Sequence, residues 1–127
     1  MGSQAAELKE RTKEFAVRIV KLFRALPKTE EARIIGRQLL RAGMSIGANY
    51  RGACRARSKA ESASKMGIVV EEADEAVFWL ELLVATSIVR EKRLEGLLAE
   101  ANELLAIFGA SQRTAKLSRA DQSSMNQ

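Results

Sequence analysis

Histidine is absent from the 127 residues of this chain. It is the commonest general base in enzymes, and it also completes Ser-His nucleophile pairs and the Glu-x-x-His ligands of di-iron helical bundles. The chain also contains no P-loop, GxGxxG or CxxC pattern. We therefore expect a protein without enzymatic activity, cofactor or bound metal.

Proline and cysteine each occur once, as Pro27 and Cys54. A single cysteine cannot form an internal disulfide, and the first residues lack the apolar stretch of a secretion signal, so we expect a cytoplasmic protein. Long apolar runs are also missing. The longest candidate, residues 76–89, is interrupted by Glu81 and is too short to span a membrane, so no membrane association is expected.

Alanine, leucine, glutamate, lysine and arginine are abundant, whereas runs of strand-forming residues are scarce. This composition favours an all-α protein. Apolar residues recur at helical spacing in four segments, which predicts helices at about 7–26, 30–54, 59–89 and 92–117. Helices of this length with short connections favour an antiparallel up-down-up-down four-helix bundle over residues 1–117. The polar remainder, residues 118–127, is expected to be disordered.

The second predicted helix separates apolar residues from charge. On a helical projection at about 100° per residue, five arginines gather on the side away from the apolar face. We call them the arginine stripe: Arg33, Arg37, Arg41, Arg51 and Arg55. Four small residues lie along the border of the apolar face, where they would let a second helix approach closely: Gly36, Gly43, Gly47 and Cys54.

The arginine stripe has two interpretations. Guanidinium groups on one face could contact phosphates in a salt-dependent and sequence-independent way. Alternatively, the arginines could pair with the acidic run at residues 71–75, which contains Glu71, Glu72, Asp74 and Glu75. Residues 1–59 carry 14 basic and 5 acidic residues, a balance of +9, and residues 60–127 carry 7 against 11, a balance of −4. This asymmetry is compatible with both interpretations.

The third predicted helix is apolar on more than one side, which indicates burial on more than one side. We assign its core face to a stripe at helical spacing: Ala63, Met66, Val70, Ala73, Val77, Leu80 and Val84. Six apolar residues fall outside that stripe: Val69, Phe78, Trp79, Leu82, Leu83 and Ile88. Four of them form the candidate interface: Phe78, Trp79, Leu82 and Leu83. We expect these four to lie at an interface between copies of the chain in a closed homo-oligomer.

The string RAGMSIGANYRG at residues 41–52, followed by Arg57-Ser58-Lys59 and by FWLELL at residues 78–83, resembles the bacterial 23S ribosomal-RNA intervening-sequence protein family. The resemblance implies a four-helix bundle that assembles as a ring-shaped homopentamer with no established enzymatic activity. A related branch is the accessory variability determinant of diversity-generating retroelements. Similarity to that branch implies a basic surface that binds nucleic acid and a reverse transcriptase.

These observations favour a homopentamer that binds RNA or DNA through the arginine stripe and engages a protein partner such as a reverse transcriptase. The alternative is a structural or adaptor oligomer without nucleic-acid affinity. In that case the arginines would pair with the acidic run within or between subunits.

Overall fold

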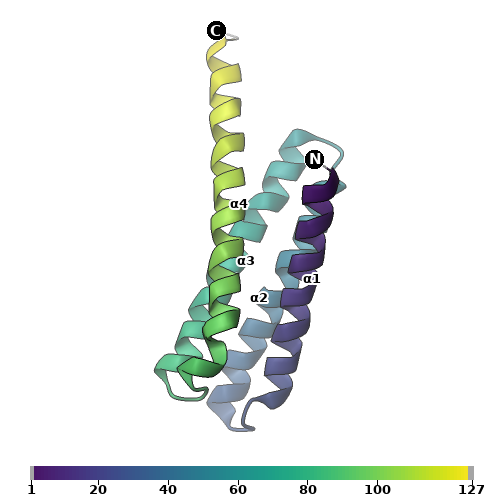
Figure 1. Cartoon of the computed structure of the whole chain (residues 1–127). Helices are drawn as coiled ribbons and strands as arrows, with labels where there is room; N and C mark the ends of the chain where they lie inside the picture. The colour runs from purple at the N-terminus through teal and green to yellow at the C-terminus, as the bar shows by residue number, and fades with distance from the viewer. Residues whose placement is uncertain (1, 126–127) are drawn as a thin grey trace.

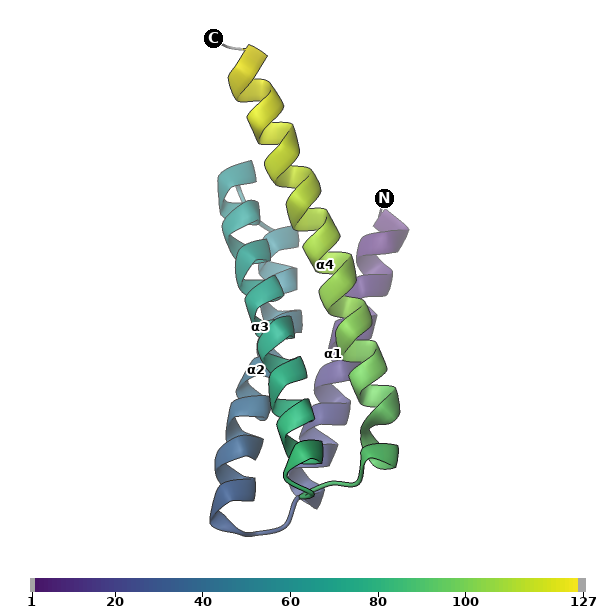
Figure 2. The same ribbon diagram turned by 90° about the vertical axis from the view of Figure 1, so that its left-hand side faces the viewer.

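The computed structural model describes the backbone of residues 2–125 and the side chains of residues 2–117. The described backbone consists of four α-helices without strands: α1 (Gly2–Ala25), α2 (Glu30–Cys54), α3 (Lys59–Ala85) and α4 (Glu91–Met125). Successive helices run in opposite directions, so the chain forms an up-down-up-down bundle (Figure 1). Figure 2 shows α3 lying beside both α2 and α4, and these contacts form the greater part of the bundle.

The sequence signals for the start of α2 and α3 are capping residues. The Thr29 hydroxyl accepts a hydrogen bond from the Ala32 amide at 3.4 Å, and the Ser58 hydroxyl accepts one from the Glu61 amide at 3.0 Å. Each cap satisfies a backbone donor that has no partner inside the helix. Glu30 and Glu31 add negative charge in the first turn of α2, where the helix dipole favours it.

The start of α1 and the end of α3 differ from the expected ranges. α1 already begins at Gly2, and α3 ends at Ala85 rather than near residue 89. Ser87 has a positive φ of 61°, which stops the helix. The apolar residues after it, including the buried Val89, continue the core beyond the helix and imitate its periodicity.

The expected disordered segment also needs correction. α4 continues from the predicted end near residue 117 to Met125, so residues 118–125 are helical. The sequence SRADQSSM contains neither glycine nor proline, and polarity alone does not end a helix. Residues 126 and 127 of that segment lie outside the described residues.

Small residues on α2 bring α1 close, as the sequence predicts. A Cβ atom added at Gly43 would lie 2.8 Å from Ile19 Cγ1, and one added at Gly47 would lie 3.2 Å from Thr12 Oγ1. Thr12 is fully buried, and its hydroxyl donates to the Leu8 carbonyl at 2.9 Å. The glycines therefore set the separation between α1 and α2.

The buried face of α3 is centred differently from the prediction. Its fully buried residues are Val69, Ala73, Ala76, Leu80 and Leu83. Met66, Val70 and Val84 of the predicted core face are only partly buried. Leu83 has no exposed surface and packs in the core of its own chain, so its predicted place at an interface between copies is wrong.

The contact between α1 and α4 is the sparsest in the bundle and includes an ion pair. Arg11 of α1 donates to Glu100 of α4 through Nη2 at 2.7 Å and through Nε at 3.1 Å, and Glu103 lies 3.2 Å away. Hydrogen bonding to Glu100 holds the pKa of Arg11 above its usual value.

A search of the described residues for membrane-spanning helices finds no helix with the length and the hydropathy that a span requires.

Candidate nucleic-acid interface

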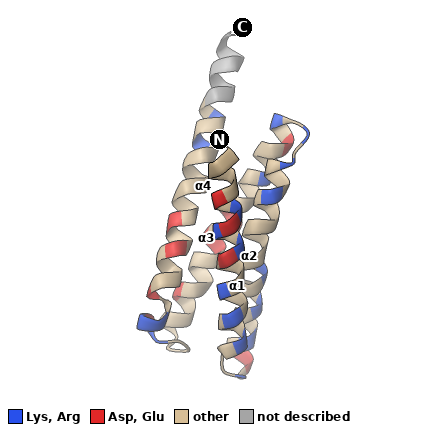
Figure 3. Ribbon diagram, turned by 45° about the vertical axis from the view of Figure 1, so that its right-hand side comes forward, with Lys and Arg blue, Asp and Glu red and all other residues tan. Residues whose placement is uncertain are grey.

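All five residues of the arginine stripe are exposed on the outer side of α2. Figure 3 shows basic residues gathered along α2 and along the adjacent part of α1. The stripe follows from the heptad spacing of α2. Core residues such as Leu39 and Ile46 are fully buried, and the arginines occupy the opposite positions of the same turns.

Arg41 differs from the rest of the stripe because it is paired. Its guanidinium contacts Glu72 of α3 at 3.2 Å and also donates to Glu75. Glu75 in turn accepts a hydrogen bond from Trp79 Nε1 at 3.1 Å. The Arg41, Glu72, Glu75 and Trp79 cluster joins α2 to α3, so the expected pairing with the acidic run is present at one arginine.

Among the residues with described side chains, the other four arginines of the stripe make no ion pair: Arg33, Arg37, Arg51 and Arg55. The one side-chain hydrogen bond recorded for them runs within α2, from Arg37 Nε to the Arg33 carbonyl at 3.3 Å. Glu71 and Asp74 of the acidic run are exposed on α3 and form no ion pair with the described arginines. These four guanidinium groups can therefore meet an external anion.

The fold adds basic residues from α1 that the sequence analysis did not include. Lys13 of α1 and Arg51 of α2 line one hollow of about 290 Å³, whose other lining includes Met44, Gly47 and Ala48. The sequence signal was present, because Gly43 and Gly47 predict a helix packed along this side of α2. What was missing was the identity of that helix and its register.

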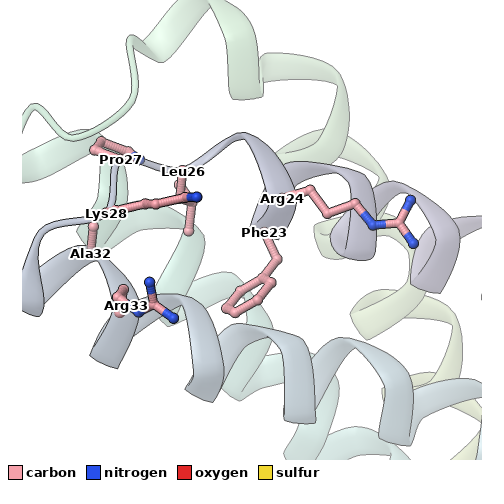
Figure 4. Close-up of a pocket in the computed structure, with 7 residues that line it drawn as sticks. All are labelled: Phe23, Arg24, Leu26, Pro27, Lys28, Ala32 and Arg33. Atoms are coloured by element: carbon pink, nitrogen blue, oxygen red, sulfur yellow. The ribbon is translucent and has the colours of Figure 1, made fainter.

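A second hollow, of about 140 Å³, lies at the turn between α1 and α2 (Figure 4). Its basic residues are Arg24, Lys28 and Arg33, and Phe23, Leu26, Pro27 and Ala32 complete it. Figure 4 shows Lys28 and Arg33 beside the turn, whereas the side chain of Arg24 extends along α1. We use the name basic groove for the surface between α1 and α2 that includes both hollows. Lys13, Arg24, Lys28, Arg33 and Arg51 line the hollows, and Arg37 is exposed on α2 between Arg33 and Arg51.

The predicted interface residues on α3 are exposed to different degrees. Phe78 is 54% exposed and packs edge-on against Trp79, with ring centroids 4.9 Å apart. Trp79 and Leu82 are half-buried. Ile34 of α2, which the sequence analysis did not single out, is 52% exposed. Phe78 is thus the residue of the predicted set that leaves the most apolar surface uncovered.

Tyr50, near the end of α2, belongs to the core rather than to the basic surface. Its ring lies 5.1 Å from that of Phe108, measured between centroids. Burial, with a smaller contribution from the neighbouring Cys54 side chain, raises the pKa of Tyr50 to about 12. Cys54 itself is exposed.

Comparisons with known proteins agree with this fold. The family model described as 23S rRNA-intervening sequence protein matches residues 4–110. A crystal structure of a protein of unknown function from the S23 ribosomal protein family of Bacteroides thetaiotaomicron VPI-5482 is similar, with 34% sequence identity and a TM-score of 0.79. The similarity covers 86% of this chain and 97% of that one. No curated protein matches the sequence.

Proposed function

The chain belongs to the 23S rRNA-intervening sequence protein family, and from this premise we propose that it is a non-enzymatic homo-oligomer that binds RNA or DNA through its basic surface. The pentameric ring, a protein partner such as a reverse transcriptase, and a cytoplasmic location are expectations from the sequence and the family resemblance. They belong to the same proposal.

The observation that carries the proposal is a set of exposed cations without ion-pair partners among the described side chains. Arg33, Arg37 and Arg51 lie on one side of α2, and Lys13 and Arg24 stand on the adjacent side of α1. Phosphate contacts of this kind release counterions from the nucleic acid, so affinity depends strongly on salt and little on sequence.

Arg41 supports a second candidate function, that of a structural or adaptor oligomer. Its ion pairs with Glu72 and Glu75 show how an arginine of the stripe can serve the fold instead of a ligand. In an adaptor, the remaining arginines would pair with acidic residues of neighbouring subunits. Such a protein would not bind nucleic acid, even at low salt.

Self-association rests on the uncovered apolar residues. Phe78 exposes more than half of its surface and packs against the half-buried Trp79, so the two rings form an apolar surface that a partner could cover. A second copy covering Phe78, Trp79 and Leu82 would remove that surface from solvent. This part of the proposal is independent of nucleic-acid binding.

The test is binding of labelled structured RNA and duplex DNA by the purified protein between about 50 and 200 mM salt, with light scattering in the same buffers. The proposal requires that the affinity for nucleic acid falls steeply as salt rises. It also requires that light scattering gives a mass larger than that of one chain. The variant Arg37→Glu/Arg51→Glu should lose binding. The matched control, Lys92→Glu/Arg93→Glu, changes the same charge at the start of α4 and should keep it. Absence of binding at low salt would favour the adaptor.

A further inference from the structure

The basic groove has a definite direction and length. Lys13 and Arg24 are eleven residues apart on α1, and Arg33 and Arg51 are eighteen apart on α2, spacings that place each pair on one side of its helix. The hollows at the two ends of the groove therefore open on the same side of the helix pair. Eighteen residues from Arg33 to Arg51 span roughly 27 Å at 1.5 Å per residue.

The charges lie on both walls of the groove, with apolar and small residues between them. Lys13 stands on the α1 side and Arg51 on the α2 side of the hollow that also contains Ala16 and Ala48. No acidic side chain lines either hollow. A rigid helix pair that presents cations in this way suits a polyanion whose charges are held at regular intervals.

Aromatic side chains for base stacking are nearly missing from this surface. Of the aromatic residues described, Phe15, Tyr50 and Phe108 are buried, and Phe78 and Trp79 are on α3. Phe23 lines the hollow at the turn, but it is half-buried and its ring packs against Gly36. Proteins that hold single strands combine a basic groove with aromatic rings on which successive bases stack.

We propose that the basic groove binds the sugar-phosphate backbone of a double-stranded nucleic acid in preference to an extended single strand. This inference rests on the proposed function and names its substrate class. A length of roughly 27 Å corresponds to about eight base pairs along the axis of a duplex at 3.4 Å each, and the groove would contact the backbone phosphates that face it. A duplex keeps its bases stacked on each other, so it requires no stacking surface from the protein.

The experiment compares three fluorescein-labelled probes of about 20 nucleotides per strand, a size that covers the groove. They are an RNA duplex, a DNA duplex of the same sequence, and oligouridine as an unstructured single strand. Fluorescence anisotropy with the full-length protein at low and physiological salt gives the affinities. We expect the duplexes to bind about tenfold or more tightly than the single strand.

The outcomes separate the inference from the proposed function. Single-strand binding as tight as duplex binding would overturn the duplex preference and leave nucleic-acid binding intact. No binding of any probe at low salt would overturn both. The variant Lys13→Glu/Arg51→Glu should lower duplex affinity at least about tenfold, and wild-type affinity in this variant would show that the groove is not the site.

A folding defect in that variant, detected by circular dichroism, would move the test to the other end of the groove. Arg24→Glu/Lys28→Glu changes two exposed side chains at the turn, where no helix packs on them. Loss of duplex affinity with a native spectrum supports the proposal, and unchanged affinity contradicts it. Lys92→Glu/Arg93→Glu is again the control for net charge.

Discussion

Arg41 of α2 and Glu72 of α3 form an ion pair at 3.2 Å, and Glu75 joins the same guanidinium to Trp79. This contact divides the arginine stripe. Arg41 belongs to the seam between two helices. The side chain of Arg37, one turn earlier on the same helix, makes a single hydrogen bond within the described part of the chain, to the Arg33 carbonyl. Two neighbouring arginines therefore have separable roles.

Replacing each of these arginines by glutamine should separate stability from binding. Arg41→Gln removes the ion pairs with Glu72 and Glu75. Since half of the Arg41 side chain is exposed, the expected loss in free energy of unfolding is only about 0.5–1 kcal/mol, with nucleic-acid affinity little changed. Arg37→Gln should leave the free energy of unfolding unchanged and weaken binding. Urea denaturation and anisotropy measure the two effects, and equal losses of affinity in both variants would contradict the division.

The close approach of α1 and α2 predicts the effect of enlarging a glycine. In Gly43→Ala the new Cβ would lie 2.8 Å from Ile19 Cγ1 and 3.0 Å from Cγ2 of a fully buried side chain. Because Ile19 has no room to move away, the free energy of unfolding should fall by about 1–3 kcal/mol.

Gly109→Ala is the matched control for this substitution. The nearest atom to its added Cβ is 3.4 Å away, at the end of the flexible Arg113 side chain. Alanine is the better helix former, so this variant should be neutral or more stable by up to about 1 kcal/mol. Thermal and urea unfolding would measure both variants. A Gly43→Ala protein as stable as Gly109→Ala would show that α1 shifts freely along α2.

The sequence was sufficient to predict the helices and the glycine contact for a local reason. Thr29 and Ser58 act within one turn of their own helix, and the glycines of α2 leave a gap that some helix must fill. Both effects depend on residues close together in the sequence. The same is true of the exposed arginines, which follow from the apolar face of α2.

The remaining features depend on register between helices, which periodicity does not determine. Leu83 and Val84 both fit a helical stripe on α3, and only packing against neighbouring helices decides that Leu83 is fully buried. Likewise, Lys13 faces Arg51 because α1 packs beside α2 at a particular height. A pattern on one helix contains no information on that height.

The buried phenol of Tyr50 predicts a loss of stability at high pH. Burial raises its pKa from 10.0 to about 12 in the folded state. Below about pH 10 the phenol is neutral in both the folded and the unfolded chain, so it does not make the free energy of unfolding depend on pH. Between about pH 10 and 12 the phenol ionises in the unfolded chain but not in the folded one, so the free energy of unfolding falls as pH rises. The loss should reach about 2–3 kcal/mol relative to Tyr50→Phe.

The measurement is the difference in free energy of unfolding between wild type and Tyr50→Phe at several pH values from 8 to 12, the interval that brackets the pKa of the phenol. Lysine side chains also titrate there, but they do so in both proteins and cancel in the difference. A difference that stays constant over this range would show that the Tyr50 hydroxyl is solvated in the folded protein.

Truncation of Leu83 and truncation of Phe78, both on α3, should change different properties: the stability of the chain and its self-association. Leu83 is fully buried in the core, so Leu83→Ala should lower the free energy of unfolding by about 2–5 kcal/mol through the cavity it leaves. Phe78 is 54% exposed within a single chain, so Phe78→Ala should scarcely change the stability of that chain. If copies associate through the surface around Phe78, however, Phe78→Ala should shift the mass measured by light scattering towards that of the monomer. Phe78→Ala particles of unchanged mass down to low micromolar concentration would place the contact between copies elsewhere.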